Sequence, residues 1–294
     1  MAKIDLLIFT GHPKAYAIKR LFEEAKRLGL KSEVVYYGDL DFSVKTGKVE
    51  VILKGQRLPV PEIAIFRTPG LHAKFGPQKG FLRRLFVHQG VRVLNQERFL
   101  SRERTDKINQ YFKMAEANLP IVPSRIFGSA KELEKITDYP VIIKHLGGSQ
   151  GRNVFKVGSL DEAQRIFTET QHVSDFLVQP FLPGGKDIRV IVLGGRALGA
   201  MRRVAQRGEF LTNFSVGGRV ENYDLSEDPE AKALAEKVAN LFKVDYTGVD
   251  LMKDDQGNWL ILEINNSAQF EGFEKATGIN VAKAIVEYLL RSPV

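Results

Sequence analysis

The segment 247–264 constrains the fold most, because it has the pattern of a β-hairpin with acidic residues on both strands. Two runs rich in β-branched and aromatic residues flank a turn-type sequence at 254–257. If the last two turn residues form a two-residue loop, Asp250 pairs directly across from Glu263. Asn265 lies two residues further along the same face of the strand, so the three side chains are expected to converge.

This convergence predicts a divalent-cation site. Two facing carboxylates repel each other unless a positive charge lies between them. Asp250, Glu263 and Asn265 supply hard oxygen ligands without cysteine or histidine, which suits Mg²⁺ or Mn²⁺. Mg²⁺ usually completes its shell with waters and substrate phosphates. The alternative is a solvated hairpin with ordinary surface acids.

Composition limits the classes of protein that the chain can belong to. Its 294 residues, 44% hydrophobic and 27% charged, are enough for two or three compact units. No apolar run approaches the roughly 18 residues of a membrane span, and residues 1–9 read as a first strand rather than a signal peptide. The absence of cysteine excludes disulfides and thiol nucleophiles, and is compatible with the cytoplasmic location that we expect.

The net charge of +8 favours acidic partners such as nucleotides, acidic amino acids or an acidic polypeptide. The basic residues are scattered, so charge alone does not support nucleic-acid binding.

Hydrophobic periodicity divides the chain into three units, predicted at 1–100, 101–180 and 181–294. The first alternates strands with helices, which is typical of a parallel α/β sheet. The other two combine helices with runs of strands, and a proline- and glycine-rich stretch at 180–185 marks the boundary between them.

A glycine-rich loop follows the strand that ends at Lys144 and His145. The loop matches the Gly-x-Ser-x-Gly pattern of hydrolases, but that motif needs a following helix and a strand comes next. We interpret the loop as a hairpin tip whose backbone N–H groups can approach an anion; an unliganded turn is the alternative. Lys144 is suited to phosphate oxygens, although an exposed edge lysine is the simpler interpretation. The residues of the loop are Gly147, Gly148, Ser149, Gln150 and Gly151.

Arginines on the next two strands are candidates for binding carboxylate or phosphate. Arg189 lies on the first, and Arg202 and Arg203 on the second, where they must face opposite sides. The five histidines lack metal-binding spacing, and neither a dinucleotide-binding glycine motif nor a P-loop occurs.

The order of these motifs resembles the ATP-grasp superfamily and, within it, the RimK-like α-L-glutamate ligases. The resemblance covers essentially the whole chain. It rests on Lys107, Lys144, the glycine loop, Gly-Lys-Asp-Ile-Arg, Met-Arg-Arg, Gly-Val-Asp-Leu, Leu-Glu-Ile-Asn and Glu-Gly-Phe-Glu-Lys-Ala-Thr-Gly-Ile. It implies an ATP-grasp fold, with α+β lobes that clamp ATP and an N-terminal Rossmann-like α/β domain.

The resemblance also implies roles for individual residues. Asp250, Glu263 and Asn265 match the Mg²⁺ (or Mn²⁺) ligands, with Glu263 bridging two ions. Arg189 and Arg203 are candidates for holding a substrate carboxylate or an acyl phosphate. The nucleotide-binding positions implied are Lys107, Lys144, Gly147–Gly151, Gln179, Pro180, Phe181, Leu182, Asp187, Leu211 and Asn213.

The reaction implied is carboxylate–amine ligation through an acyl phosphate. An amino acid, with glutamate favoured, would be joined to an amine- or carboxylate-bearing acceptor such as an acidic peptide, and family precedent implies a homo-oligomer. The chain departs from the family pattern at Pro180, at Leu211, where an arginine is usual, and at Ala268-Gln269 beside the expected acceptor. The alternatives are a ligase for a different substrate and a nucleotide-binding module that has lost catalysis.

Overall fold

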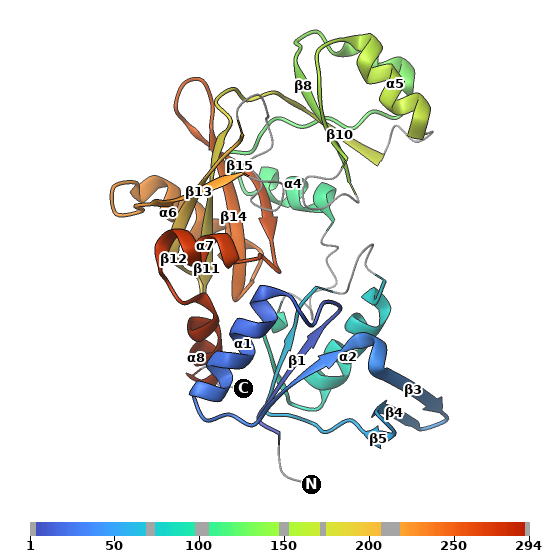
Figure 1. The fold of residues 1–294 in the computed structure, drawn as a ribbon. Helices are drawn as coiled ribbons and strands as arrows, with labels where there is room; N and C mark the ends of the chain where they lie inside the picture. The colour runs from blue at the N-terminus through green and yellow to red at the C-terminus, as the bar shows by residue number, and fades with distance from the viewer. Residues whose placement is uncertain are drawn as a thin grey trace.

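The computed structural model describes residues 4–68, 74–97, 106–146, 153–170, 175–206 and 218–291. Within these ranges the chain forms a parallel sheet and three antiparallel ones, which lie in successive parts of the chain (Figure 1). The predicted combination of an α/β unit with α+β units is present in these ranges.

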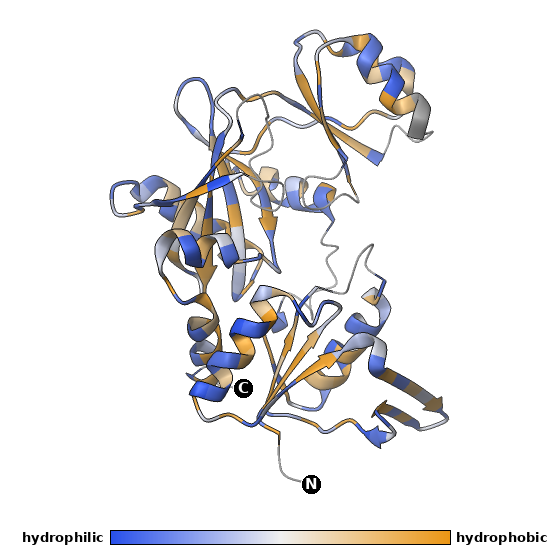
Figure 2. Cartoon of the chain, in the orientation of Figure 1, coloured by the Kyte–Doolittle hydropathy of each residue, from blue (hydrophilic) through white to orange (hydrophobic). Residues whose placement is uncertain are grey.

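The first unit is built on a parallel sheet of strand order β2-β1-β6-β7. Strands β1 and β6 are buried along their whole length, as expected for a parallel sheet covered on both faces. Figure 2 shows these strands as largely apolar. The elements are β1 (Leu6–Thr10), α1 (Tyr16–Arg27), β2 (Ser32–Tyr36), β6 (Ile63–Phe66), α2 (Gly76–His88) and β7 (Arg92–Val93).

A small antiparallel sheet is inserted between β2 and β6 and was not predicted. It follows a 3₁₀ turn, η1 (Tyr37–Asp39), and consists of β3 (Leu40–Lys45), β4 (Lys48–Leu53) and β5 (Gln56–Arg57). Its hairpin tip exposes Val44 and Val49, so little of it carries the apolar alternation that marks a half-buried strand.

The central unit has its own three-stranded sheet, of order β10-β8-β9, and its own apolar core. Its elements are η3 (Ala130–Lys135), β8 (Val141–His145), β9 (Val154–Val157), α5 (Leu160–Thr170) and β10 (Phe176–Pro180). Helix α4 (Lys107–Glu116) precedes them in sequence but packs elsewhere, because Tyr111 and Met114 belong to the core of the C-terminal sheet.

The last unit is a five-stranded antiparallel sheet of order β13-β12-β11-β14-β15. Its strands are β11 (Lys186–Leu193), β12 (Arg196–Val204), β13 (Arg219–Tyr223), β14 (Tyr246–Lys253) and β15 (Trp259–Asn265). The helices are α6 (Pro229–Leu241), α7 (Glu271–Thr277) and α8 (Val281–Arg291). Asp228 caps α6 by accepting a hydrogen bond from the Ala231 amide, and Pro229 occupies the first turn, both common at helix starts.

The first and last units share one apolar core. Helix α8 returns to pack against α1 (Figure 1), and buried residues of both units, such as Leu21 and Ile285, form a single cluster. None of the helices in the described ranges has the length and apolar character needed to cross a membrane.

Candidate active site

The β14–β15 hairpin places Asp250 opposite Glu263, as predicted, but by a different route. The predicted two-residue loop is wrong. The turn is closed by Asp254 and Asn258, and its Gly257 adopts the left-handed conformation. This shifts the pairing by one residue, and a β-bulge beside Asp250 shifts it back.

Glu263 and Asn265 lie side by side at the end of β15. The Asn265 side-chain Nδ2 donates to Glu263 Oε1 at 2.9 Å, and both residues are half-buried. Gly248 pairs with Asn265 and leaves room for the following loop, because a Cβ there would lie 2.8 Å from the Ala268 Cβ. The pair is therefore held at a strand end against a tightly packed loop.

Asp250 is the centre of a buried ion-pair chain. Arg189 donates to both of its carboxylate oxygens, each at 2.7 Å, and Arg203 Nη2 reaches Oδ2 at 2.9 Å. Arg203 also makes a two-pronged contact with Asp187, at 2.6 and 2.7 Å. Burial alone would raise the pKa of Asp250, but Arg189 and Arg203 outweigh it and lower the pKa to about 2.

The guanidinium of Arg203 is therefore balanced by two acids within the protein. It is only 3% exposed, and Asp187 and Asp250 raise its pKa despite its burial. Arg202 faces the opposite side of β12, where it approaches Glu221 at 4.0 Å in solvent. The predicted division of the two arginines between opposite faces is confirmed. Arg203 is therefore placed to position Asp187 and Asp250. The side chain of Arg189 is more exposed, at 12%, and lies closer to solvent.

Lys144, on strand β8 of the central sheet, interacts electrostatically with the acids of this hairpin. Burial lowers the pKa of its ammonium, the carboxylates of Glu263, Asp250 and Asp187 oppose that shift, and Lys107 reinforces it. Lys144 thus shares one electrostatic environment with Lys107 and with two of the predicted metal ligands, Glu263 and Asp250. Lys144 lies on β8 and Lys107 on α4, whereas Asp250 lies on β14 and Glu263 on β15.

The described hinge residues surround the end of β10. Pro180 pairs with Val141 at the end of the strand, where the missing N–H is tolerated, and the Phe181 amide donates to the Pro140 carbonyl at 3.1 Å. Lys156 Nζ lies 3.8 Å from the centre of the Phe181 ring. Leu182 is half-buried beyond it. The predicted residues Gly147–Gly151, Leu211 and Asn213 lie outside the described residues.

A buried hydrogen-bond network ties the hinge to the hairpin, and sequence reasoning missed it. Gln179 Nε2 donates to Tyr111 Oη and to Ser124 Oγ, each at 2.8 Å. The Tyr111 hydroxyl donates in turn to the carbonyl of Leu262, the extra residue of the bulge. The only sequence signal is a tyrosine one helical turn after Lys107 on the apolar face of its helix.

The segment 120–125 makes the same connection through the backbone. Ile261 donates to Pro120 at 2.8 Å, while Arg125 and Val178 exchange hydrogen bonds at 2.9 and 2.8 Å. One short stretch of chain therefore joins β15 to β10, and so fixes the two sheets relative to each other near Lys144 and Glu263.

The donor set at this junction fits a hard divalent cation. In the part of the chain that the structure describes, no three His, Cys, Asp or Glu side chains gather as a metal cage. Two carboxylates and an amide leave coordination positions for water and phosphate, which is how Mg²⁺ is usually bound. Because the oxygens of Asp250 already accept from arginines, Glu263 and Asn265 are the better-placed primary ligands.

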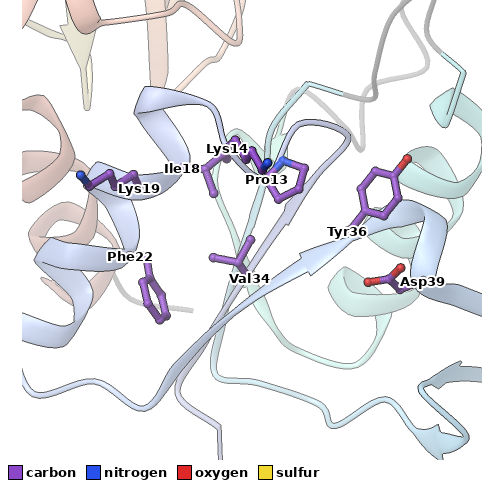
Figure 3. Close-up of a pocket in the computed structure, with 8 residues that line it drawn as sticks. All are labelled: Pro13, Lys14, Ile18, Lys19, Phe22, Val34, Tyr36 and Asp39. Atoms are coloured by element: carbon purple, nitrogen blue, oxygen red, sulfur yellow. The ribbon is translucent and has the colours of Figure 1, made fainter.

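A separate pocket of about 630 Å³ lies between α1 and β2 (Figure 3). Lys14, Lys19 and Asp39 line it together with apolar side chains such as Phe22 and Val34. None of its lining residues was a predicted site residue, and the pocket belongs to the first unit rather than to the junction around Glu263.

Comparison with known proteins identifies the family. A model described as the RimK-like ATP-grasp domain matches residues 101–289. A probable alpha-L-glutamate ligase of Legionella pneumophila (strain Paris) is 31% identical over 295 residues, which cover 97% of this chain and 95% of that protein.

Solved structures support the fold. The ATP-grasp ligase PsnB, complexed with a phosphomimetic variant of its minimal precursor, Mg and ADP, matches with a TM-score of 0.76 at 20% identity, covering 98% of each chain. Macrocyclase MdnC of Microcystis aeruginosa MRC, bound with precursor peptide MdnA, matches with a TM-score of 0.72 at 14% identity, covering 98% of this chain and 100% of that one. The chain therefore belongs to the RimK-like ATP-grasp family, and it is an ATP-dependent ligase.

Proposed function

We propose that this protein uses ATP to join a substrate carboxylate to an amine through an acyl phosphate, and that glutamate is the amino acid added. The observation that supports the proposal is that Lys144, on β8, interacts electrostatically with Lys107 on α4 and with Glu263 and Asp250 on the β14–β15 hairpin. The relatives named as probable alpha-L-glutamate ligases support glutamate. The precursor peptides bound to PsnB and MdnC support a peptide-like acceptor.

In this proposal Glu263 and Asn265 would hold Mg²⁺ or Mn²⁺. The bound cation would neutralise negative charge on the transferring phosphoryl group. Lys144 and Lys107 bind phosphate oxygens as point charges, and the half-buried position of Lys144 strengthens its interaction with them.

The remaining residues position these groups. Arg203 and Asp187 keep Asp250 ionised and fixed, and Arg189 is the candidate for contact with the substrate carboxylate or acyl phosphate. The hinge residues Gln179–Leu182 receive the adenine, and no protein nucleophile is required.

The three predicted units would have different parts in this function. Residues 1–100 would form the N-terminal α/β domain, 101–180 would cover the nucleotide, and 181–294 would carry the cation site. The predicted homo-oligomeric state and cytoplasmic location stay predictions.

The test is release of ADP and phosphate from Mg²⁺-ATP with a panel of amino acids and acidic peptides. We expect turnover that depends on L-glutamate and falls by about a hundredfold or more in Glu263→Ala, because one interaction made in the transition state is lost. The matched control is Asp255→Asn, an exposed acid in the turn of the same hairpin, which should behave as wild type.

Turnover with a different amino acid would keep the ligase chemistry and overturn glutamate. Tight ATP binding without turnover on the whole panel would instead favour a nucleotide-binding module.

A further inference from the structure

Side chains of the first unit hold one loop of the last unit. The loop, residues 266–269, directly follows Asn265, where β15 ends. Arg67 Nη2 donates to the carbonyls of Ala268 at 2.8 Å and Ser267 at 3.3 Å. Arg67 comes directly after β6, so these bonds cross from the first unit to the last. The backbone of the loop is therefore fixed by a side chain from outside its own unit.

Asn95, which follows β7, holds the same loop from a second point. Its Nδ2 donates to the carbonyl of Asn266 at 3.2 Å and to that of Tyr246 at 3.0 Å, while its Oδ1 accepts from the Tyr246 amide at 2.7 Å. Gln269 Nε2 makes a longer contact with Thr68 Oγ1, at 3.5 Å. Each of the four residues of the loop thus contacts the first unit.

Arg67 is buried, so it acts through the loop rather than by contact with substrate. The residue is 2% exposed, and the rings of Tyr246 and Phe270 lie 5.7 and 5.8 Å from its guanidinium. Among the described residues its Nε has no hydrogen-bond partner, and no acid pairs with it. Carbonyls and aromatic faces orient the charge but do not neutralise it. A buried charge of this kind lowers stability, which points to a role in function rather than in folding.

The held loop in turn fixes the end of β15. The Ala268 amide donates to the Asn265 carbonyl at 3.2 Å, which closes a turn directly after the predicted ligand. On the neighbouring strand, a Cβ on Gly248 would lie 2.8 Å from the Ala268 Cβ and 3.3 Å from Arg189 Cδ. The loop, the strand end and Arg189 are therefore packed without spare room. A displaced loop would move Asn265 and its hydrogen bond to Glu263.

We propose that Arg67 and Asn95 are positioning residues for the cation site. They fix the loop 266–269 and, through it, the side chain of Asn265, so that the first unit sets the affinity of the last unit for its divalent cation. This inference rests on the proposed function and deepens its cation site. Groups that orient metal ligands without touching the metal change metal affinity by about 10–100-fold when they are removed.

The experiment measures calorimetric binding of ADP to the full chain, with Mn²⁺ and with EDTA, for wild type, Arg67→Met and Glu263→Ala. The difference between the two conditions isolates the part of the affinity that depends on the metal. We expect Arg67→Met to weaken binding of Mn²⁺-ADP about tenfold. Its binding of metal-free ADP should stay within about twofold of wild type.

Arg92→Met is the matched control. Arg92, on β7, also donates to a backbone carbonyl of the last unit, and its buried Nε also lacks a partner among the described residues. That carbonyl belongs to Leu289 in α8 rather than to the loop 266–269. Arg92→Met should therefore bind Mn²⁺-ADP like wild type.

Two further measurements separate positioning from a structural role. Arg67→Lys should recover most of the Mn²⁺-ADP affinity, because both bonds come from one nitrogen and an ammonium has three donors. The unfolding midpoint of Arg67→Met should stay near that of wild type. The Ala268 carbonyl keeps its bond from the Tyr246 hydroxyl, at 2.9 Å, and a buried charge is removed.

Asn95→Gly is the second variant, and it carries the test if Arg67→Met does not fold. Glycine accepts the φ of 64° at this position, so the substitution removes the side chain without straining the backbone. The Asn266 carbonyl then loses its bond from Asn95, and the metal-dependent part of the affinity should fall as it does in Arg67→Met.

Unchanged Mn²⁺-ADP affinity in Arg67→Met and Asn95→Gly, with a loss in Glu263→Ala, would overturn the positioning role and leave the cation site standing. Equal weakening of metal-free ADP, or an equal loss in Arg92→Met, would also overturn it. Wild type that binds ADP equally with and without Mn²⁺ would overturn the cation site and this inference together. A metal-dependent loss in Arg67→Met without glutamate-dependent turnover would uphold the positioning role while the proposed glutamate ligation fails.

Discussion

Arg202 and Arg203 are neighbours on β12, and the strand sends them into opposite environments. Arg203 is enclosed by Asp187 and Asp250, whereas Arg202 is half-buried beside Glu221 and lies over the Tyr223 ring. Removing one partner of a buried ion pair leaves the other charges uncompensated, which is far more costly than losing a surface pair. Side-chain alternation predicted the separation, but no pattern in the sequence predicted the two acids.

We therefore expect Arg203→Met to lower the free energy of unfolding by about 3–5 kcal/mol. Arg202→Met should lower it by less than about 1 kcal/mol. Urea unfolding at neutral pH measures both. Equal losses for the two variants would show that the buried ion pairs of Arg203 with Asp187 and Asp250 do not contribute more to the free energy of unfolding than a surface pair.

Lys79 predicts a pH dependence of stability. Burial of its ammonium in helix α2, reinforced by the charges of Arg83 and Arg67, lowers the pKa of Lys79 to about 7 in the folded protein, from the ordinary value of about 10.4 when unfolded. Between these values the unfolded chain binds more protons, so the free energy of unfolding should rise with pH from about 7 to 10. Lys79→Met lacks this contribution, and urea unfolding across that range should show a shallower rise for the variant. Parallel curves would contradict the effect of burial on the Lys79 ammonium.

At the scale of elements, the β-bulge in β15 sets both the register and the network of Tyr111. The bulge compensates for a turn one residue longer than predicted, so Asp250 still meets Glu263. It also presents the Leu262 carbonyl to the Tyr111 hydroxyl, which accepts from Gln179. Sequence reasoning predicted the pairing but not the bulge, because its position depends on contacts with α4 that are distant in sequence.

Tyr111→Phe should raise the KM for Mg²⁺-ATP and the Mg²⁺ concentration for half-maximal rate several-fold. The substitution removes the hydroxyl that joins Gln179 to Leu262, and so loosens both the hinge and the strand that carries Glu263. Unsatisfied Gln179 and Leu262 groups should also cost about 1–3 kcal/mol of stability.

Tyr223→Phe is the control, because Tyr223 donates to Asp228 at 2.6 Å away from the junction. It should lose comparable stability without any change in Mg²⁺ dependence. If both variants shift that dependence equally, the Tyr111 network has only a structural role.

At the scale of the whole molecule, the shared core makes the first and last units cooperative. Leu21 in α1 and Ile285 in α8 are fully buried in one cluster, and Arg20 pairs with Glu274 at 3.0 Å across the same boundary. The central unit has a separate core around Phe167 and Phe176. The first and last units should therefore unfold together, and the central unit can open alone.

The single tryptophan, Trp259 in β15, reports on this cooperativity. Leu21→Ala lies in a different unit but should lower the midpoint of the Trp259 fluorescence transition, because a cavity there costs about 2–5 kcal/mol. Phe167→Ala, in the core of the central unit, should move that midpoint much less. An unchanged Trp259 transition in Leu21→Ala would show that the two units unfold independently.

Local patterns predicted the strand–helix alternation of the first unit and the hairpin of the last, because apolar runs such as β1 and β6 mark buried strands. The order of the motifs carried the family resemblance, and the resemblance implied the roles of the site residues. The inserted sheet β3–β5, the position of α4 on the C-terminal sheet and the burial of Arg67 could not be predicted. Each depends on packing between segments far apart in the chain.

The central claim is that Lys144 and Glu263 face one another across a single nucleotide and cation site. A crystal structure with Mn²⁺ and a non-hydrolysable ATP analogue tests it most directly, because anomalous scattering locates the ion. We predict Mn²⁺ bound to oxygens of Glu263 and Asn265, with Lys144 on the nucleotide phosphates. An ion bound away from Glu263, or a nucleotide that Lys144 does not contact, would contradict the account.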